Sequence, residues 1–553
     1  MSVINADPAA PPAQPQTAPL LAISGLKVEY QSGTAAVDGV DLALRAGEIV
    51  ALVGESGSGK TTLARSVLGL LPATARIRGS IDFDGTDLAS LSEKEFRRIR
   101  GRRIGLVPQD PGTSLDPVRT IGSQVAEVFR LHRDGRRRSR SELRAEVIRL
   151  LTLVGIDRPE ERLRQYPHEL SGGLKQRVLI AIAFSLQPQV LIADEPTSAL
   201  DVTVQRTVLE VFDRLAKEYG TAVIFVTHDL AVATDHADRI VVMRAGTVRE
   251  DRGVERILNR PEDEYTVRLL EEAAPGRAAS PAAAATESVG GPFALEARGL
   301  VKVFERGGAH RAVDAVSFGV RPGTTFSLVG ESGSGKSTTA RMLMRLLDPT
   351  EGSVLVHGRD MTGLDGRGKR ELWRTLQLVY QNPDSALDPR LRIRDIISEP
   401  MVNFDLGSRT DQRARVAELL EQVNLPVRAA SARPMELSGG QRQRVAIARA
   451  LAAGARTLVL DEALSALDVL TQAQILALLE ELQRELGLTY LFISHDLHVV
   501  ERISHEVGVM RRGRLVETGP TARIFGDPQH EYTRLLLDSN PGHRLRTLAA
   551  STN

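Results

Sequence analysis

Cysteine is absent from this chain of 553 residues. The absence excludes disulfides, thiolate zinc sites and cysteine-held iron–sulfur clusters. The chain also lacks any run of about 18 apolar residues, so we predict that no segment spans a bilayer. Its first residues, MSVINADPAAPPAQPQTAP, lack the basic and apolar blocks of a signal peptide. Their Ala, Pro and Gln content predicts a disordered tail at 1–19, and we expect the chain to stay in the cytoplasm.

A charge excess of either sign is missing as well. Lys and Arg number 71 against 70 Asp and Glu, for a net charge of +1. A strongly cationic surface is therefore not expected, and nucleic acid is not predicted as a partner. The content of 42% hydrophobic and 25% charged residues is typical of a soluble globular protein, and the length indicates at least two domains.

The sequence contains an internal repeat. The stretch VGESGSGKTT at 53–62 returns as VGESGSGKST at 329–338. This repetition predicts two homologous domains, at 20–272 and 294–553. The residues between them, 273–293, are rich in Ala, Pro, Gly and Ser, which predicts a flexible linker.

Short apolar runs alternate with helical patterns in each half, which indicates an α/β fold with a mainly parallel sheet. Several of these runs are followed at once by polar residues that could carry chemistry. The predicted strands are 48–54, 190–194 and 222–228 in the first half, and 324–330, 457–461 and 489–495 in the second.

A phosphate-binding pattern, G-x-x-x-x-G-K-[ST], occurs at 54–61 and again at 330–337. Its glycines let successive backbone N–H groups surround phosphate oxygens. Lys60 and Lys336 would reach the β- and γ-phosphates, while the hydroxyls of Thr61 and Ser337 would ligate Mg²⁺. A chance glycine-rich turn is the alternative for one copy, but it does not explain two copies that each follow a strand and precede a helix.

Acidic residues close the second predicted strand of each half. Asp194 and Asp461 could hold Mg²⁺, and the adjoining Glu195 and Glu462 could act as general bases that polarise water. In isolation such a pair could equally be a solvated loop. After a phosphate loop in the same domain, the catalytic interpretation is favoured.

Histidines end the third predicted strand of each half. His228 and His495 could contact the γ-phosphate and orient the attacking water. A lone histidine is usually structural. Two in the same register at the end of a buried strand favour catalysis.

Ser-Gly-Gly also occurs twice, in HELSGGLKQR at 168–177 and MELSGGQRQR at 435–444. A helix start offers unpaired N–H groups and partial positive charge, which suit an anion, and glycine removes the Cβ that would keep a phosphate away. The alternative is an ordinary cap, in which Ser171 or Ser438 covers a free N–H. The residues alone leave both interpretations open.

Together these motifs resemble the ABC transporter ATPase family in its fused twin-cassette form. Gln109 in VPQDP and Gln381 in VYQNP match its Q-loop, LSGG at 170–173 and 437–440 its signature, and SALD at 198–201 and 465–468 its D-loop. The resemblance implies two tandem P-loop nucleotide-binding domains. Each would have a RecA-like parallel-sheet core, an antiparallel β subdomain and a helical signature subdomain.

The resemblance also implies that the two halves pair head to tail, so that the signature of each half caps the γ-phosphate held by the other. Tyr30 and Phe304 would stack on adenine, and Gln109 and Gln381 would contact Mg²⁺ and water. The implied ATP contacts are Tyr30, Gly54, Ser56, Gly57, Gly59, Lys60, Thr61, Thr62, Gln109, Ser171, Gly172, Gly173, Phe304, Gly330, Ser332, Gly333, Gly335, Lys336, Ser337, Thr338, Gln381, Ser438, Gly439 and Gly440. The implied Mg²⁺ ligands are Thr61, Gln109, Asp194, Ser337, Gln381 and Asp461.

Further stretches are similar to the dipeptide/oligopeptide/nickel importers of this family. They are QDPGTSLDP at 109–117, QNPDSALDP at 381–389, and the tails PEDEYTVRLL at 261–270 and PQHEYTRLLL at 528–537. This similarity implies an importer ATPase that drives peptide uptake. It would work with two transmembrane permease subunits and an extracytoplasmic solute-binding protein, at the cytoplasmic face of the inner membrane. The iron–sulfur cluster of some members cannot form without cysteine.

Departures from the family pattern lie beside the implied contacts. Leu174 and Lys175 replace the Gln-Gln or Gln-Arg common after LSGG, and Ala463 stands where the first half has Pro196. We therefore predict two competent ATP sites, although their rates could differ.

Other functions stay open at this point. Nickel or metallophore complexes and glutathione are alternative cargoes for the same motor. A soluble twin-cassette factor acting on ribosomes is an alternative from another class, although such proteins usually have a long charged helical linker. A DNA-repair cassette protein is disfavoured because zinc cysteines and coiled-coil heptads are missing between the motifs.

Overall fold

The computed structural model describes residues 18–30, 33–132, 138–198, 200–273, 291–305, 310–465 and 467–551. These residues form two compact units. The first holds most of the first half of the chain. The second holds Thr197–Glu210, His228–Asp235 and the chain from Glu255 onward, which includes the whole second half. Residues 1–17 of the predicted tail and 274–290 of the predicted linker lie outside the described residues.

Each half of the described chain contains a six-stranded sheet and a four-stranded sheet. In the first half the six-stranded order is β10 (Thr247–Gly253), β9 (Arg239–Arg244), β3 (Ile49–Val53), β8 (Ala222–Thr227), β7 (Val190–Asp194) and β6 (Ile104–Val107). All neighbours are parallel except β10 and β9. The four-stranded sheet is antiparallel, in the order β2 (Ala35–Leu44), β1 (Leu21–Glu29), β4 (Arg76–Phe83) and β5 (Thr86–Asp87).

The second half repeats this arrangement. Its six-stranded order is β16 (Leu376–Val379), β17 (Thr457–Asp461), β18 (Thr489–Ile493), β13 (Thr325–Val329), β19 (Glu506–Arg511) and β20 (Arg514–Pro520). Its antiparallel sheet runs β12 (His310–Val320), β11 (Leu295–Phe304), β14 (Glu351–Val356) and β15 (Arg359–Asp360). The fold class predicted from the sequence is confirmed, and all six predicted strands are present within a residue or two of their predicted bounds.

Helices fill the intervals between strands. In the first half they are α1 (Lys60–Val67), α2 (Glu93–Ile99), α3 (Pro111–Ser114), α4 (Ile121–Leu131), α5 (Arg140–Leu153), α6 (Pro159–Arg162), α7 (Gly172–Phe184), α8 (Val202–Tyr219), α9 (Leu230–His236), α10 (Val254–Asn259) and α11 (Glu264–Ala273). In the second half they are α12 (Lys336–Leu343), α13 (Gly366–Thr375), α14 (Pro383–Ala386), α15 (Ile393–Asn403), α16 (Arg409–Gln422), α17 (Gly439–Ala452), α18 (Val469–Leu486), α19 (Leu497–Ile503), α20 (Thr521–Gly526), α21 (Glu531–Asp538) and α22 (His543–Ser551).

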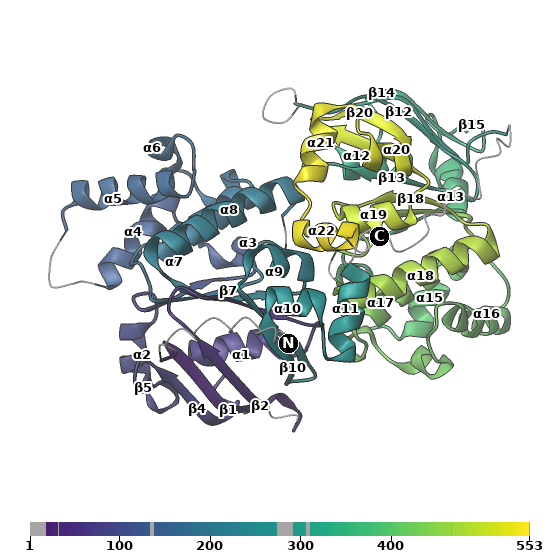
Figure 1. Ribbon diagram of the computed structural model, residues 1–553. Coiled ribbons are helices and arrows are strands. Elements are labelled where there is room, and N and C mark those ends of the chain that lie inside the picture. The colour runs from purple at the N-terminus through teal and green to yellow at the C-terminus, as the bar shows by residue number, and fades with distance from the viewer. Residues whose placement is uncertain are drawn as a thin grey trace, which may run out of the picture. The chain divides into compact units, whose positions relative to one another are not determined.

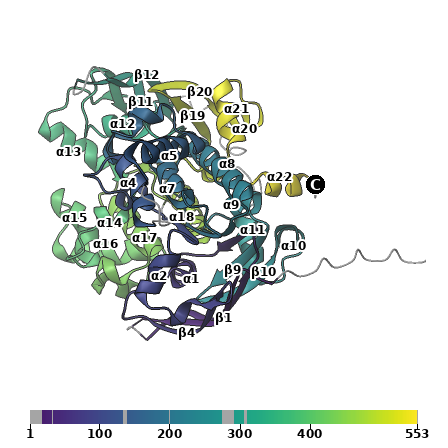
Figure 2. The same cartoon turned by 90° about the vertical axis from the view of Figure 1, so that its left-hand side faces the viewer.

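Each half has its helical part and its antiparallel sheet on opposite sides of the six-stranded sheet. In the first half α4 and α5 lie away from β1 and β4, and in the second half α15, α16 and α17 lie away from β12 (Figure 1 and Figure 2). The central strands β3 and β13 are buried at every residue, as expected of parallel strands covered on both faces. Within the described residues, no helix combines the length and apolar character needed to cross a bilayer.

The antiparallel sheet packs against one face of the central sheet and shares its core. In the second half Phe318 of β12 and Phe326 of β13 stack with ring centroids 4.7 Å apart, beside Leu295, Val313 and Leu328. The other face of that central sheet is covered by the helical part, where Ile393, Leu420 and Val445 pack with Leu458 and Phe492. The phosphate loop thus leaves a strand that is fixed from both sides.

A glycine makes the close crossing between β14 and β11 possible. The pairing of these strands slips between Arg298 and Val301, and Gly352 lies opposite with φ +90°. A Cβ at Gly352 would lie 2.3 Å from the carbonyl oxygen of Gly299. Gly79 repeats this arrangement in the first half, where its Cβ would lie 2.6 Å from the Gly25 oxygen.

We predict that Gly352→Ala lowers the free energy of unfolding by about 1–3 kcal/mol, because the alanine must adopt a left-handed backbone and displace Gly299. Scanning calorimetry of the full chain would measure this loss. Gly363→Ala is the control, since a Cβ there meets nothing within 4 Å. Equal unfolding temperatures for the two variants would contradict the prediction.

Candidate nucleotide site

The first phosphate loop joins β3 to α1 and depends on two close backbone approaches. A Cβ at Gly54 would lie 2.1 Å from the carbonyl oxygen of Met243, and one at Gly59 would lie 2.3 Å from that of Ala36. Both glycines have positive φ, at +157° and +99°. The loop is therefore pressed against β9 and β2, which leaves Ser56 and Gly57 at its tip exposed to solvent.

The second loop, from β13 to α12, has the same geometry. A Cβ at Gly330 would lie 2.1 Å from the Met510 oxygen, and one at Gly335 would lie 2.6 Å from the Ala312 oxygen. Gly333 at the tip has φ +79° and open space around it, so its glycine is needed for conformation rather than for room.

The lysine of each loop turns back over the loop. Lys60 Nζ donates to the carbonyl oxygens of Gly54 and Glu55 at 2.7 and 2.9 Å. Lys336 Nζ donates to Gly330 and Glu331 at 2.7 and 2.8 Å. Both side chains are buried, and burial lowers the pKa of Lys336. A buried ammonium at the centre of a glycine loop suits a strongly anionic ligand.

A second feature of the loop fits such a ligand. The hydroxyl of Ser334 is buried and has no hydrogen-bond partner among the described residues. A buried hydroxyl without a partner is costly, and a phosphate oxygen would satisfy it. The donor set of the loop therefore fits the phosphates of ATP.

The hydroxyl residue that follows each lysine contacts an aspartate. This aspartate ends the strand that lies two places away, in the sheet, from the strand before the loop. Thr61 Oγ1 donates to Asp194 Oδ1 at 3.0 Å, and Ser337 Oγ donates to Asp461 Oδ1 at 3.0 Å. Burial raises the pKa of both carboxyls. A hydroxyl and a carboxylate that converge at one point form the hard oxygen pair that Mg²⁺ prefers, so the residues present fit this ion.

The glutamates that follow adopt an unusual backbone. Glu195 and Glu462 have φ of +46° and +49°, in the left-handed region that non-glycine residues rarely adopt. Each N–H donates to the neighbouring strand, to Val226 O and Ile493 O at 2.9 Å. The chain therefore turns sharply after β7 and β17. Such strain costs about 1–3 kcal/mol and is typical of functional sites.

This turn brings each glutamate to a Q-loop glutamine. Gln109 Nε2 donates to Glu195 Oε2 at 2.8 Å, and Gln381 Nε2 donates to Glu462 Oε2 at 2.7 Å. The glutamines follow β6 and β16, which neighbour β7 and β17 in the sheets. The structure therefore brings together the glutamates and glutamines that the sequence placed on separate elements.

The histidines lie at the ends of β8 and β18 and are half-buried. His495 Nδ1 lies 3.6 Å from Glu462 Oε2. Burial opposes the charged form of His495, but contact with the Glu462 carboxylate outweighs it and raises the pKa of the imidazole. The same contact lowers the pKa of Glu462. His495 thus faces the proposed base rather than packing in the core.

The Ser-Gly-Gly stretches begin helices, as the ordinary-cap interpretation requires. Ser171 caps α7 and accepts from Leu174 N at 3.4 Å, and Ser438 caps α17 and accepts from Gln441 N at 3.3 Å. Ser171, Gly172 and Ser438 are nevertheless exposed, so the caps leave these turns accessible to a ligand. The two interpretations are therefore compatible.

The two aromatic residues differ in their surroundings. Tyr30 Oη lies 3.4 Å from Thr62 Oγ1, close to the first phosphate loop. Phe304 is 41% exposed, and Lys302 Nζ lies 5.5 Å from its ring centroid. Both rings are accessible enough to stack on a base.

The structure adds a contact that residue types alone did not identify. In the second unit, Asp201 Oδ2 accepts from the backbone N–H of Ser332 at 3.1 Å. Asp201 closes the SALD motif of the first half, and Ser332 lies in the second phosphate loop. The motif matched the D-loop by resemblance, but its spacing gave no partner for the aspartate.

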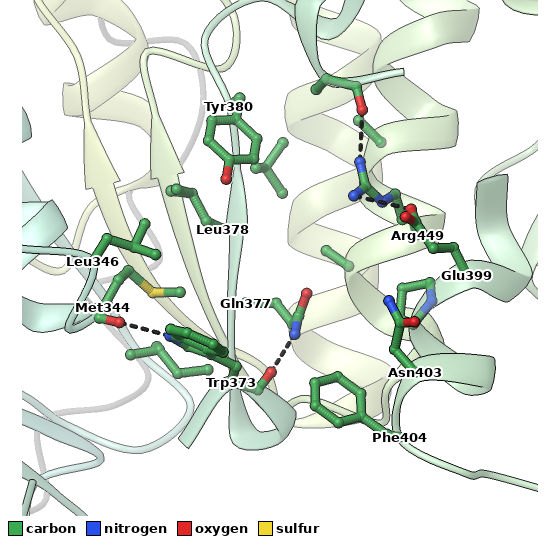
Figure 3. A pocket seen from close by; sticks show the side chains of 16 residues that line it. Met344, Leu346, Trp373, Gln377, Leu378, Tyr380, Glu399, Asn403, Phe404 and Arg449 are labelled. Atoms are coloured by element: carbon green, nitrogen blue, oxygen red, sulfur yellow. Dashed lines mark hydrogen bonds and ion pairs between the residues drawn. The ribbon is translucent and has the colours of Figure 1, made fainter. Parts of the chain in front are cut away.

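A pocket of about 230 Å³ opens beside the Q-loop of the second half. Figure 3 shows Tyr380 and Leu378 on one side and Glu399 with Arg449 on the other. Its floor is apolar and includes Met344, Leu346, Trp373, Leu376, Phe404 and Ala446.

Polar contacts hold residues of the pocket lining in place. Trp373 Nε1 donates to the Met344 oxygen at 2.8 Å, and Arg449 pairs with Glu399 at 3.2 Å (Figure 3). Leu346 and Tyr380 remain 50% and 47% exposed. An accessible apolar floor beside the charged pair of Arg449 and Glu399 suits an amphipathic segment of another protein.

Comparison with known proteins places these features in a family. The model of the family described as ABC transporter matches residues 37–198 and 313–465. The oligopeptide transport ATP-binding protein OppD of Mycobacterium tuberculosis is 41% identical, over 95% of this chain and 98% of the relative. The glutathione import ATP-binding protein GsiA of Salmonella typhimurium is 43% identical, over 94% and 89%.

A third relative aligns with nearly the whole chain, and a solved structure matches part of it. The peptidoglycan transport ATP-binding protein YejF of Agrobacterium fabrum is 42% identical, over 94% of this chain and 96% of the relative. The solved ATP-binding cassette MJ0796 bound to ADP and Pi is 30% identical, with a TM-score of 0.38, and covers 41% of this chain and 98% of that one. With both halves matched by the family model and relatives aligned over nearly the whole length, this chain belongs to the ABC transporter family.

Proposed function

We propose that this chain is the ATPase subunit of an importer and drives uptake of peptides through separate permease subunits at the cytoplasmic face of the inner membrane. The observation that carries the proposal is the set of relatives, whose names describe oligopeptide, glutathione and peptidoglycan transport and which align over more than nine-tenths of the chain. The two sets of loop, carboxylate and histidine residues are consistent with two ATP sites.

In the proposed reaction the phosphate loops hold ATP through backbone N–H groups and through Lys60 or Lys336. Tyr30 and Phe304 stack on the adenine. Mg²⁺, when bound by Thr61 with Asp194, or by Ser337 with Asp461, would neutralise charge on the phosphates. These hydroxyl–carboxylate pairs, already 3.0 Å apart, need little rearrangement to accept it.

The glutamates act as bases in this proposal. Glu195 or Glu462 takes a proton from the attacking water, while Gln109 or Gln381 holds the carboxylate from the other side. His228 or His495 orients the water and the γ-phosphate. The left-handed backbone of both glutamates supports the assignment. A surface loop without a function would adopt a less strained conformation, whereas functional sites often retain such strain.

Head-to-tail pairing of the halves completes each site. Lys60, Asp194 and Glu195 would act with the Ser438 turn, and Lys336, Asp461 and Glu462 with the Ser171 turn. The contact of Asp201 with the Ser332 N–H supports this pairing, because it brings a first-half motif to the second phosphate loop. ATP that is held by both halves favours the closed arrangement, and hydrolysis removes that bias.

The pocket beside Gln381 is a docking site for a cytoplasmic segment of a permease subunit in this proposal. Tyr380 lines the pocket and directly precedes Gln381, whose amide holds Glu462. A permease segment bound there would contact Tyr380. Through the adjoining Gln381 it would act on the position of the Glu462 base. Its apolar face would cover Leu346 and Phe404, and a basic residue would meet Glu399.

Two cargoes are distinguished by experiment. Oligopeptides are the first choice, and glutathione is favoured as a second candidate by the relative that is 43% identical. With the complete transporter in vesicles, an oligopeptide or glutathione should raise ATP turnover when its solute-binding protein is present. Recovery of the chain on ribosomes, with none in membranes, would defeat the importer proposal.

The two bases should contribute almost equally. We predict that Glu195→Gln and Glu462→Gln each lower ATP turnover strongly, and that the double variant loses about 10²–10⁴-fold, as expected for removal of a general base. The two single variants should agree within about fivefold in a phosphate-release assay. Very different residual rates would contradict two competent sites.

Cross-linking can test the head-to-tail pairing, because the chain has no native cysteine. We predict that Ser56→Cys forms a disulfide with Ser438→Cys, and Ser332→Cys with Ser171→Cys, when ATP is trapped by the Glu195→Gln and Glu462→Gln changes. A disulfide needs Cα atoms within about 7 Å, so it reports direct apposition on a gel.

The matched control pairs residues of the same half. Ser56→Cys with Ser171→Cys should give no ATP-dependent cross-link, because each signature serves the other half in this proposal. An ATP-dependent cross-link in this control pair would refute head-to-tail closure. The same conclusion would follow if neither test pair formed a cross-link.

Permease docking should depend on the pocket floor. We predict that Leu346→Glu abolishes co-purification with the permease subunits but leaves ATP turnover of the isolated chain unchanged, because a carboxylate in the floor must be desolvated on docking. Leu486→Glu, at a leucine that is 37% exposed and outside the pocket, is the control. Equal recovery of the permeases with both variants would refute this docking site.

A further inference from the structure

The tail motif that the sequence repeats at 261–270 and 528–537 lies outside the phosphate loops, the carboxylates and the Ser-Gly-Gly turns. In the second half this motif forms α21, and Tyr532 lies in its first turn. The side chain is 1% exposed and is among the largest fully buried side chains of the described residues. Full burial of a tyrosine places its hydroxyl inside the protein, where it needs a partner.

That partner is the second phosphate loop. Tyr532 Oη accepts the backbone N–H of Glu331 at 3.0 Å. The carbonyl oxygen of the same residue accepts from Lys336 Nζ at 2.8 Å. Both backbone groups of Glu331 are therefore fixed, one by the tail tyrosine and the other by the lysine that faces the phosphates.

The Tyr532 ring packs against a residue of the central sheet. The Arg511 guanidinium lies 4.6 Å from the centroid of its ring. Arg511 ends β19 and directly follows Met510, whose carbonyl oxygen presses against Gly330. The end of one strand thus contacts both the start of the loop and the ring that supports it.

Hydrogen bonds also fix the start of α21. The Glu517 carboxylate on β20 accepts the backbone N–H groups of Gln529 and His530 at 2.8 and 3.0 Å. His530 Nδ1 in turn accepts from Tyr532 N at 3.0 Å. The position of the hydroxyl is therefore determined by the sheet rather than by a free helix end.

Burial raises the pKa of Tyr532 well above its usual value. The group therefore stays a neutral hydroxyl and keeps a lone pair for the Glu331 N–H. A phenolate would add negative charge beside a loop that receives phosphates, so a neutral acceptor suits this position.

We propose that Tyr532 is a positioning residue, which holds the loop from Gly330 to Ser337 in the shape that accepts the phosphates of ATP. The proposal rests on the proposed function, because it assumes that this loop binds ATP. Tyr265 occupies the same register in the first tail and is likewise buried, at 3% exposed.

Tyr532→Phe tests the hydroxyl while keeping the ring and its packing. In the full chain that also carries Lys60→Ala, the second loop is the intact one, and Mg-ATP binding there can be followed by titration. We expect Tyr532→Phe to raise the Kd by about 3–10-fold, the effect of losing one hydrogen bond. The unfolding temperature should also fall, since the Glu331 N–H loses its partner.

Tyr490→Phe is the matched control in the same chain. Tyr490 is fully buried, and its hydroxyl donates to the Leu479 oxygen at 2.9 Å in the core of the same half. This variant loses an equivalent hydrogen bond, so its unfolding temperature should fall comparably while its Kd stays unchanged. If both variants lower the unfolding temperature but only Tyr532→Phe raises the Kd, the result supports a positioning role for Tyr532.

The opposite outcomes overturn the proposal. An unchanged Kd for Tyr532→Phe, or an equal rise for Tyr490→Phe, would make the tyrosine a structural residue only. A failure of the Lys60→Ala chain to bind Mg-ATP at all would instead refute the assignment of the second loop as an ATP site. That result is visible before Tyr532 is changed, so the two failures are distinguishable.

Discussion

The close approach of each glycine loop to a strand backbone is the constraint on which the site depends. Gly54 and Gly330 pass so near the carbonyl oxygens of Met243 and Met510 that a methyl group could not fit. This contact fixes where the loop starts, and the lysine can then fold back over it to meet its carbonyl oxygens. If the loop stood off the sheet, its N–H groups would point in divergent directions and would no longer form an anion site.

Strand order places the other candidate residues at the same edge of the sheet as this fixed loop. Strands β3, β8 and β7 lie side by side and are parallel, so the residues that follow them meet at one edge of the sheet. The first phosphate loop follows β3 and Asp194 ends β7, so Thr61 of the loop and Asp194 meet although they are far apart in sequence. The next strand, β6, adds Gln109, and the same order in the second half explains why the same contacts recur there.

Buried strands and repeated motifs could be read from the sequence because they are local. The strand Val190–Asp194 is apolar up to its last residue, which carries a carboxylate. The apolar run predicts its burial, and Asp194 marks its polar end. The left-handed backbone of Glu195 could not be read this way, since glutamate has no preference for it and the sheet imposes it. The bond from Gln109 to Glu195 and the reach of Tyr532 to Glu331 depend on tertiary packing between distant segments.

A small difference between the halves follows from one residue type. Gln441 closes a reciprocal cap at the start of α17, where its Oε1 accepts from Ser438 N at 3.0 Å. Leu174 occupies that place in the first half and cannot accept a hydrogen bond, so Ser171 caps α7 alone. A cap contact of this kind contributes about 0.5–2 kcal/mol. In a head-to-tail pair the looser Ser171 turn would close the Lys336 site, so any inequality between the two sites should fall on the second phosphate loop rather than the first.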